Sequence, residues 1–356
     1  MFKDKLKKIQ RALREQKLDG LVLGNFGFHL YDDLLYYLLL RVPEHLVAFI
    51  PVAGKPTLYA IPFEVGELTR AYPACRVRPL AASTASLLTP IVQGKKRIGL
   101  RPSTLPANIY QALKRVARTR WKNFDREKEI MAIKLPSEVI RLRRAAKLTD
   151  QIFTRLIRRW RRFRTETDIA QFILLEIAKH GLTPSFPPIV ATGRNAANPH
   201  YQPQNKKIQS GFCVLDFGVR AAGYCSDMTR TIYVGKPNAA ERALYQTLLE
   251  AQTSTVKKVR AGVATADLDD FCRQKLGKRL NKQFVHGLGH GLGTQVHEWP
   301  SVSANQPVLL EENMLITIEP GVYQAGKYGI RIEDDVVVTK KGAKILTMST
   351  KKLIAV

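Results

Sequence analysis

The hydrophobic positions in the first 125 residues alternate between a helical period and short apolar runs. The period predicts an amphipathic helix over 3–16, and the apolar runs predict strands at 20–24, 46–52, 57–61 and 97–100. This order is typical of a small α/β domain, which we expect to span 1–128. The most notable polar residues of this domain belong to no catalytic motif. We expect them to lie in a loop in which their side chains have hydrogen-bond partners. These residues are Asn25, His29, Asp32 and Asp33.

The pattern changes after residue 135, where a long helical period begins. Ser137 follows a proline and is the expected N-cap of a helix that continues to 157. A second amphipathic helix is expected over 165–180, with Gly181 placed to end it. The remaining sequence has the pattern of strands and hairpins, so we expect an α+β second domain over 129–356.

Composition places the excess charge on a folded protein. Of the 356 residues, 45% are hydrophobic and 24% charged, which excludes a disordered basic protein. The net charge is +27, and 131–165 holds 11 of the 57 basic residues but only 2 of the 30 acidic ones. We interpret the densest run, 155–164, as a solvated helix face; binding of phosphates or an anionic membrane is the alternative. Its central arginines are Arg158, Arg159, Arg161 and Arg162.

Two further patterns concern the compartment. Residues 1–13 form a Lys-rich amphipathic stretch and not a signal peptide, and the most apolar early run, 34–40, is far shorter than the ~18–20 residues of a membrane span. We therefore expect a soluble, cytoplasmic protein without a membrane partner. The cysteines form no CxxC pair, so we expect them to be reduced and structural: Cys75, Cys213, Cys225 and Cys272.

Acidic residues within apolar strand sequence suggest the chemistry of the second domain. Asp216 ends one apolar run, and the chain returns through a second run that contains Asp227. If the two runs form a hairpin centred between Ala221 and Ala222, these carboxylates lie directly opposite one another. Burying two carboxylates that close together costs several kcal/mol unless a cation or a shared proton holds them.

The same arrangement recurs downstream. The runs 315–321 and 329–335 flank a glycine-rich turn whose midpoint is Gly326, which makes Glu319 and Glu333 partners across a second hairpin. A lone buried pair could be structural. Two such hairpins in one domain are hard to explain without a metal.

A nitrogen ligand is expected from the segment 284–293, FVHGLGHGLG, which contains His286 and His290. Its alternating glycines forbid a stable helix and no Glu follows His286, so an HExxH zinc motif is excluded. Extended glycine-rich backbone instead suits close approach to a metal, with one histidine as ligand and the other near substrate. We expect His200 and His297 at the same site.

The combined ligand set indicates a reaction class. Four carboxylates and one imidazole are mostly oxygen ligands, which favours Mn, Fe or Co over a thiolate-type zinc site. Carboxylates that bridge imply two ions ~3.5–4 Å apart, which would activate a shared water and polarise a scissile carbonyl. The residues therefore indicate metal-assisted hydrolysis.

These residues resemble those of the pita-bread metallopeptidases, a family that includes prolidase, aminopeptidase P, methionine aminopeptidase and creatinase. The resemblance covers about 133–356, and the first domain is similar to the creatinase-type amino-terminal domain, although LYDDLLYY departs from the usual sequence. It implies a creatinase-like α/β domain followed by a pita-bread α+β catalytic domain. The motifs LDFG, SDMTRT, HGLGHGLG, TIEPG and GIRIEDD contain Asp216, Asp227, His290, Glu319 and Glu333 in that order.

The resemblance implies a role for each ligand. Asp216 would bind one metal, and Asp227 and Glu333 would bridge both. His290 and Glu319 would bind the second metal. Glu319 would also carry a proton from the bridging water toward the leaving nitrogen.

The resemblance also assigns the remaining site residues. His200 and His297 would hydrogen-bond the scissile carbonyl and the tetrahedral intermediate, and His286 would line the substrate pocket. Arg331 would orient a ligating carboxylate and contribute to substrate binding.

Among these relatives, the sequence favours an active Xaa-Pro peptidase, and its length fits an aminopeptidase P and a prolidase equally; our first expectation is an Xaa-Pro aminopeptidase. Methionine aminopeptidases lack the Arg-x-Glu-Asp sequence and this kind of first domain, and creatinase-like relatives lose metal ligands that are all present here. An Xaa-Pro dipeptidase, or prolidase, is the alternative. A more distant alternative is a noncatalytic protein that binds nucleic acid or another partner through 155–164, although we do not expect nucleic acid as a partner. The expected cofactors are two divalent ions, foremost Mn²⁺, with Co, Fe or Zn as alternatives, and the expected assembly is a homodimer.

Overall fold

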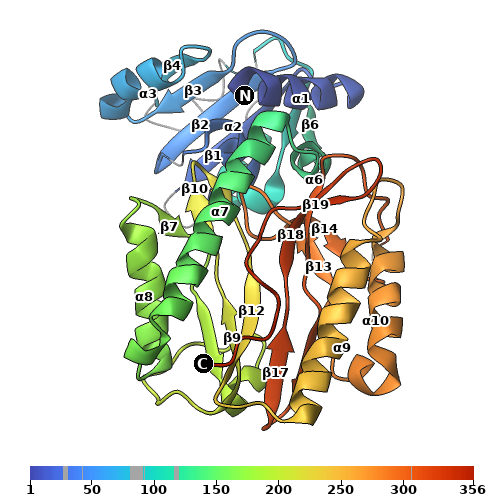
Figure 1. Ribbon diagram of the computed structural model, residues 1–356. Coiled ribbons are helices and arrows are strands. Elements are labelled where there is room, and N and C mark those ends of the chain that lie inside the picture. The colour runs from blue at the N-terminus through green and yellow to red at the C-terminus, as the bar shows by residue number, and fades with distance from the viewer. Residues whose placement is uncertain (27–30, 42, 81–90, 92, 116–119, 306) are drawn as a thin grey trace. The chain divides into compact units, whose positions relative to one another are not determined.

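The chain forms two compact units, Met1–Met131 and Ala132–Val356 (Figure 1). The computed structural model describes all residues except 27–30, 42, 81–90, 92, 116–119 and 306. The division falls shortly after the expected boundary at 128, because the helix that begins at Glu127 places Ile130 and Met131 in the core of the first unit. In the described part of the chain, no helix combines the length and apolar character needed to cross a membrane.

The first unit is built on a six-stranded mixed sheet with the order β4-β3-β2-β1-β5-β6. Alternate residues of β1 enter two separate cores: Leu21 and Leu23 pack with the apolar face of α1, and Val22 packs on the opposite side. The helix and the four strands that the hydrophobic pattern predicts are present as α1, β1, β2, β3 and β5, and the unit contains further elements that were not predicted. The elements are α1 (Phe2–Glu15), β1 (Gly20–Phe26), α2 (Asp33–Leu39), β2 (His45–Pro51), β3 (Thr57–Ala60), η1 (Pro62–Glu64), α3 (Val65–Ala71), β4 (Arg76–Pro79), β5 (Arg97–Leu100), η2 (Pro102–Thr104), α5 (Ala107–Arg115), β6 (Arg120–Asn123) and α6 (Glu127–Ala132).

The polar residues that the sequence highlights in this unit serve the structure. Asp32 caps α2 by accepting two backbone N–H groups, and its buried carboxylate lies 2.7 Å from the Arg101 guanidinium. Asp33 contacts the same guanidinium, and the Asn25 side chain accepts the Asp32 N–H at 3.0 Å. His29 lies outside the described residues. The expectation of satisfied side chains is confirmed for the other three, whereas the expected loop is wrong, because Asn25 lies in β1 and Asp33 begins α2.

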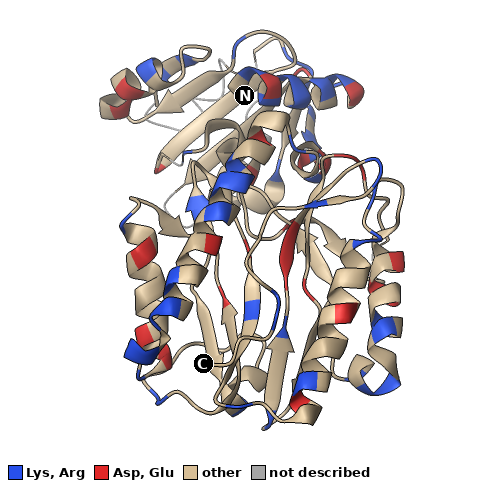
Figure 2. Ribbon diagram, viewed as in Figure 1, with Lys and Arg blue, Asp and Glu red and all other residues tan. Residues whose placement is uncertain are grey.

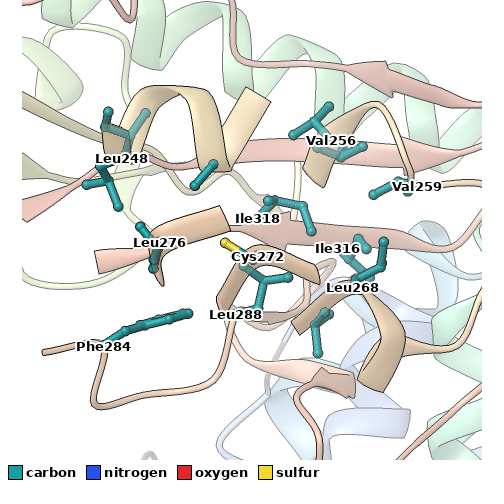
Figure 3. Packing of buried hydrophobic residues seen from close by; sticks show 14 of the residues in the cluster. Leu248, Val256, Val259, Leu268, Cys272, Leu276, Phe284, Leu288, Ile316 and Ile318 are labelled. Carbon is teal, nitrogen blue, oxygen red and sulfur yellow. The ribbon is translucent and has the colours of Figure 1, made fainter. Parts of the chain in front are cut away.

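The second unit surrounds its strands with two pairs of helices (Figure 1). Helices α7 and α8 pack with β8, β9 and β12, and helices α9 and α10 pack with β14, β15 and β18. The core between α9, α10 and their strands includes Leu248, Leu276, Leu288 and Ile316 (Figure 3). Burying each such side chain contributes ~1.5–3 kcal/mol, so this core fixes the strands that carry the polar residues described below.

The helices of the second unit are α7 (Pro136–Arg158), η3 (Trp160–Arg162), α8 (Glu166–Ala178), η4 (Gly193–Ala197), α9 (Ala239–Val256) and α10 (Thr265–Asn281). Its strands are β7 (Thr183–Pro184), β8 (Ile189–Thr192), β9 (Gly211–Asp216), β10 (Val219–Ala221), β11 (Tyr224–Cys225), β12 (Thr229–Val234), β13 (Gly289–Gly291), β14 (Glu298–Val302), β15 (Leu315–Ile318), β16 (Gly321–Gln324), β17 (Tyr328–Arg331), β18 (Asp334–Val338) and β19 (Ala343–Ile345). They form sheets with the orders β11-β10-β7, β12-β9-β8, β14-β13-β15-β18-β19 and β16-β17. All four cysteines of the chain are buried free thiols, as expected.

Helix α7 begins earlier than predicted. Its first residue is Pro136 and its N-cap is Leu135, so the prediction of Ser137 as the cap is wrong. The fixed φ of proline suits the first helical position, and the Glu138 carboxylate accepts the Leu135 N–H at 2.8 Å in place of a capping hydroxyl. Thr165 caps α8, where its hydroxyl oxygen accepts the Asp168 N–H at 3.1 Å.

The basic run 155–164 spans the end of α7 and η3 (Figure 2). Arg155 forms an ion pair with Glu176 at 2.7 Å, and the Arg159 guanidinium lies 5.7 Å from the centre of the Phe172 ring. Positive charge is also stabilised at the carboxyl end of a helix. These contacts support the interpretation of the run as a helix surface.

The close approach of two backbones in the second unit gives a test of the fold. A Cβ at Gly218, between β9 and β10, would lie 1.8 Å from the Ser226 carbonyl oxygen. We expect Gly218→Ala to lower the free energy of unfolding by roughly 1–3 kcal/mol, because the strands must move apart. Urea unfolding should show this against Gly342→Ala, where a Cβ meets no atom within 4 Å. Equal midpoints for the two variants would contradict the packing.

Candidate functional site

All nine residues that the sequence places at the site line one cavity of the second unit. The cavity has a volume of about 610 Å³. Its walls also include apolar residues, among them Phe186, Pro188 and Val296. The nine expected residues are His200, Asp216, Asp227, His286, His290, His297, Glu319, Arg331 and Glu333.

The first carboxylate pair does not have the predicted register. Asp216 at the end of β9 pairs with Thr229 of β12 and not with Asp227. The turn is centred between Ala222 and Gly223, one residue later than predicted, and their φ angles are +49° and +84°. Two consecutive positive φ angles form the hairpin turn that matches the twist of the strands. The shift leaves Asp227 in the unpaired segment before β12, where it still faces the cavity.

The second carboxylate pair has the predicted register. The ladders β15–β18 and β16–β17 are both centred on Gly326, and Glu319 and Glu333 lie opposite one another in the gap between them. In this gap the Glu319 N–H donates to the Leu288 carbonyl at 2.8 Å, and the Glu333 N–H donates to the Thr229 carbonyl at 3.1 Å. The hairpin is thus bonded to the histidine segment and to β12, which brings the two carboxylate pairs together.

The histidine segment requires glycine where the sequence has it. A Cβ at Gly289 would lie 2.1 Å from the Thr317 carbonyl oxygen, and one at Gly291 would lie 2.3 Å from the Trp299 carbonyl oxygen. The segment forms the short strand β13 between β14 and β15. The expectation of extended, closely packed backbone is therefore confirmed.

His290 presents one ring nitrogen to the carboxylates. Its Nδ1 lies 3.0 Å from the Gly291 carbonyl oxygen, which can only accept, so Nδ1 carries the proton. Its Nε2 lies 3.3 Å from Glu319 Oε1 and 3.7 Å from Asp227 Oδ2. A histidine held in this way by a backbone carbonyl has the orientation of a metal ligand.

The buried carboxylates have strongly displaced pKa values. Burial, reinforced by neighbouring carboxylates, raises the pKa values of Asp227 and Glu333 well above their usual range. Burial also raises the pKa of Asp216, against the opposing charge of Arg331. For Glu319, burial is outweighed by the hydrogen bond and charge of His290, which lower its pKa to about 2.

The side chains fit a divalent cation. One oxygen of Asp227, one oxygen of Glu333 and one ring nitrogen of His290 lie within 4.8 Å of one another. Asp216 Oδ1 is buried and has no hydrogen-bond partner in the described part of the chain. An oxygen-rich set with one imidazole suits Mn, Fe, Co or Zn. A cation would satisfy the unpaired oxygen and offset the repulsion among the carboxylates.

Arg331 contacts a candidate ligand as expected. It is buried, its Nη2 lies 2.6 Å from Asp216 Oδ2, and its Nε donates to Thr229 Oγ1 at 3.0 Å. Thr229 Oγ1 in turn donates to Glu333 Oε2 at 2.7 Å. One guanidinium and one hydroxyl thus orient carboxylates of both hairpins. The assignment of Arg331 to substrate binding stays a prediction.

Tyr323 is a site residue that the sequence analysis missed. Its hydroxyl accepts a hydrogen bond from Arg331 Nη1 at 2.8 Å and lies 3.1 Å from His286 Nε2. Alternation along the strand was the available signal, because residues 319, 321 and 323 share one face. A Cβ at Gly321 would lie 2.4 Å from the Tyr323 hydroxyl oxygen, so the absence of a side chain at 321 leaves room for the Tyr323 ring.

The other histidines surround the carboxylates at different depths. The His297 ring packs edge-on against the His290 ring, with 4.4 Å between centres. Burial lowers the pKa values of His286 and His297, so both imidazoles are neutral at neutral pH. His200 is exposed and borders the cavity.

Comparison with known proteins gives two family matches. Residues 140–340 match the family described as metallopeptidase family M24, and residues 5–132 match the creatinase/prolidase N-terminal domain. An uncharacterized peptidase of Staphylococcus aureus is 39% identical over 223 residues. That stretch is 62% of this chain and 64% of the relative.

Similar solved structures extend over nearly the whole chain. An Xaa-Pro dipeptidase from Bacillus anthracis has a TM-score of 0.90 and 29% identity, and each chain is covered to 100%. A prolidase from Pyrococcus horikoshii has a TM-score of 0.87 and 30% identity, with 99% of this chain and 100% of that chain covered. An X-Pro aminopeptidase from Thermotoga maritima has a TM-score of 0.89 and 27% identity, with 97% and 100% covered.

The raised pKa values predict that cation binding releases protons. A carboxyl with a raised pKa keeps its proton until the pH exceeds that value, and Asp227 and Glu333 must lose theirs to bind a metal. We expect Mn²⁺ to bind the metal-stripped protein more tightly as the pH rises from about 5 to about 8. Titration calorimetry in buffers of different ionisation enthalpy measures the protons released.

Glu333→Gln should reduce the number of protons that are released when Mn²⁺ binds. Glu312→Gln, at an exposed position, should leave this number unchanged. Binding heats that are independent of the buffer in the parent protein would refute the assignment.

Proposed function

Because the chain belongs to metallopeptidase family M24, we propose that it is an Xaa-Pro aminopeptidase, which hydrolyses the bond between an N-terminal residue and a following proline. The family resemblance and two-domain fold indicated by the sequence are confirmed by the family matches and similar structures. The observation that carries the proposed activity is the convergence of four carboxylates and His290 with three further histidines in one cavity. This composition suits metal-assisted hydrolysis.

Five side chains would hold two divalent cations, foremost Mn²⁺. Asp216 would bind one ion, Asp227 and Glu333 would bridge both, and His290 and Glu319 would complete the second position. When bound, the ions supply Lewis acidity to the scissile carbonyl and lower the pKa of water. The mutual proximity of the donor atoms of Asp227, His290 and Glu333 supports the position that these three side chains would share.

The chain's own groups would move protons and stabilise charge. Glu319 would take a proton from the attacking water and deliver it to the leaving nitrogen. His200 and His297 would donate N–H groups to the carbonyl oxygen as negative charge develops on it. His286, held by the Tyr323 hydroxyl, would border the bound peptide.

The cavity favours a peptide that continues beyond proline over a free dipeptide. A dipeptide presents its carboxylate beside the proline, and a buried carboxylate needs a cationic partner. Among the described residues that line the cavity, Arg331 is the only Lys or Arg, and its guanidinium contacts Asp216 and Tyr323. The lowered pKa values of His286 and His297 keep these imidazoles neutral. This supports aminopeptidase over dipeptidase action.

The other interpretations have less support. A noncatalytic anion-binding protein would not need five convergent metal donors, all of which are present here. A homodimer and a cytoplasmic location stay predictions from the sequence.

Peptide hydrolysis tests the proposed function. We expect the Mn-loaded protein to cleave Ala-Pro-Ala with a kcat/KM at least ~10-fold above that for Ala-Pro, and to leave Met-Ala-Ala intact. The reason is that the described lining of the cavity offers no Lys or Arg, apart from the already paired Arg331, to a dipeptide carboxylate. Faster cleavage of Ala-Pro would identify a dipeptidase. Release from neither proline peptide would refute the proposal.

Asp227→Asn is the matched inactive variant. It should lose at least ~100-fold in activity with an unchanged circular dichroism spectrum, because it removes one bridging carboxylate. Retained turnover with full metal content would contradict the assignment of Asp227.

A cation introduced into the cavity should change the preferred substrate. Ser301 lines the cavity, is exposed, and lies opposite His290 in the β13–β14 ladder. We expect Ser301→Arg to raise kcat/KM for Ala-Pro by ~10-fold, because the guanidinium can pair with the dipeptide carboxylate. Ser301→Gln, a long uncharged control, should give no gain. Equal effects of the two variants on Ala-Pro hydrolysis would refute the argument from charge.

A further inference from the structure

His297 lies in the segment 294–297, the later part of the connection 292–297 between β13 and β14. The first residue of β14, Glu298, turns its side chain back onto this connection. We propose that Glu298, together with Lys134, is a positioning residue that fixes His297 beside the metal ligand His290. The inference rests on the proposed function, because it is in that reaction that His297 acts on the substrate carbonyl.

The Glu298 carboxylate closes the connection on itself. Its Oε1 accepts the Thr294 N–H at 2.7 Å, the Thr294 hydroxyl at 3.0 Å and the Gln295 N–H at 3.0 Å. These three hydrogen bonds to one carboxylate oxygen hold Thr294 and Gln295 against Glu298. His297 lies between these two points, so its backbone has little freedom.

The other carboxylate oxygen is anchored from a distant part of the chain. Glu298 Oε2 lies 2.5 Å from Lys134 Nζ, and the two side chains are only 4% and 2% exposed. Lys134 is itself held through its backbone N–H, which donates to the Asn313 carbonyl at 2.9 Å. The position of the connection is therefore fixed relative to the segment that leads into β15.

Neighbouring residues are adapted to this pair. A Cβ at Gly293 would lie 2.4 Å from Glu298 Oε2 and 2.6 Å from Lys134 Nζ, so a side chain at this position would displace the pair from its present geometry. On the other side, Arg220 Nη1 donates to the Thr294 carbonyl at 2.6 Å. The connection is thus bonded on several sides within the second unit.

The reason for a charged anchor is geometric. A buried ion pair adds little stability over apolar residues of the same volume, but removing one partner leaves an unpaired buried charge. What the pair supplies is a fixed position for the His297 ring, which packs edge-on against the His290 ring at 4.4 Å between centres. A displacement of ~1 Å in such a group costs up to ~100-fold in rate.

Glu298→Gln tests this role. The amide keeps one oxygen for the Thr294 and Gln295 donors but turns an N–H donor toward Lys134, so the connection must shift. We expect kcat for Ala-Pro-Ala to fall ~10- to 100-fold, with KM within ~3-fold and metal content unchanged. Combining Glu298→Gln with Lys134→Met removes the clash of donors and should recover most of the lost kcat.

Glu176→Gln is the matched control, because Glu176 is also buried and ion-paired but lies on α8 and does not line the cavity. It should lower the thermal midpoint without changing kcat. Thr294→Val, which removes only the hydroxyl donor, provides a milder variant and should lower kcat a few-fold. Wild-type kcat in both Glu298→Gln and Thr294→Val, or the same kcat loss in Glu176→Gln, would overturn the proposal.

A readout independent of activity separates this inference from the proposed function. In ¹⁵N-histidine-labelled protein, the imidazole signals of His297 should shift in Glu298→Gln and not in Glu176→Gln. If the parent protein cleaves no proline peptide but these signals shift, the proposed function fails and the positioning role stands. Unshifted His297 signals in Glu298→Gln overturn the positioning role even in an active enzyme.

Discussion

The second unit is organised around the repulsion among four carboxylates that share one cavity. Burial and mutual repulsion raise the pKa values of Asp227 and Glu333, and within the described lining the opposing groups are the Arg331 guanidinium and the His290 ring. A protein gains nothing in stability from such a cluster, because the desolvation of each charge outweighs its pairing. The cluster is explained by cations that it binds, and the surrounding architecture is explained by the need to hold it together.

Backbone contacts hold the carboxylates where repulsion would separate them. The N–H groups of Glu319 and Glu333 are bonded to the histidine segment and to β12, so neither arm of the second hairpin can move outward alone. Gly289 and Gly291 allow β13 to lie against its neighbours at distances that no other residue permits. Behind these strands, the core of α9 and α10 fixes Leu288 and Ile316 (Figure 3). The rigidity of the site thus comes from packing outside it.

The sequence predicts those parts of the site that depend on local pattern. The register about Gly326 was predictable because glycines mark a symmetric turn, whereas the first hairpin was misplaced because Ala222 adopts a positive φ, which alanine rarely does. Strand alternation could have revealed Tyr323. The pairing of Lys134 with Glu298 could not be predicted, because 164 residues separate the partners and neither belongs to a local motif.

The difference between local motifs and long-range contacts also separates the reaction class, which can be predicted from sequence, from the substrate specificity, which cannot. The reaction class is legible in short motifs because the residues that we propose as metal ligands, such as His290 and Glu319, must be particular residue types at particular places. Substrate length depends on which charges around the cavity are already paired, and Arg331 illustrates this: its presence in a motif suggests a substrate contact, but its guanidinium is bonded to Asp216 and Tyr323. A cation that is already paired within the protein is a weaker partner for a substrate carboxylate. Specificity in this fold is therefore decided by contacts among residues that are distant in sequence, and it has to be argued from the folded structure.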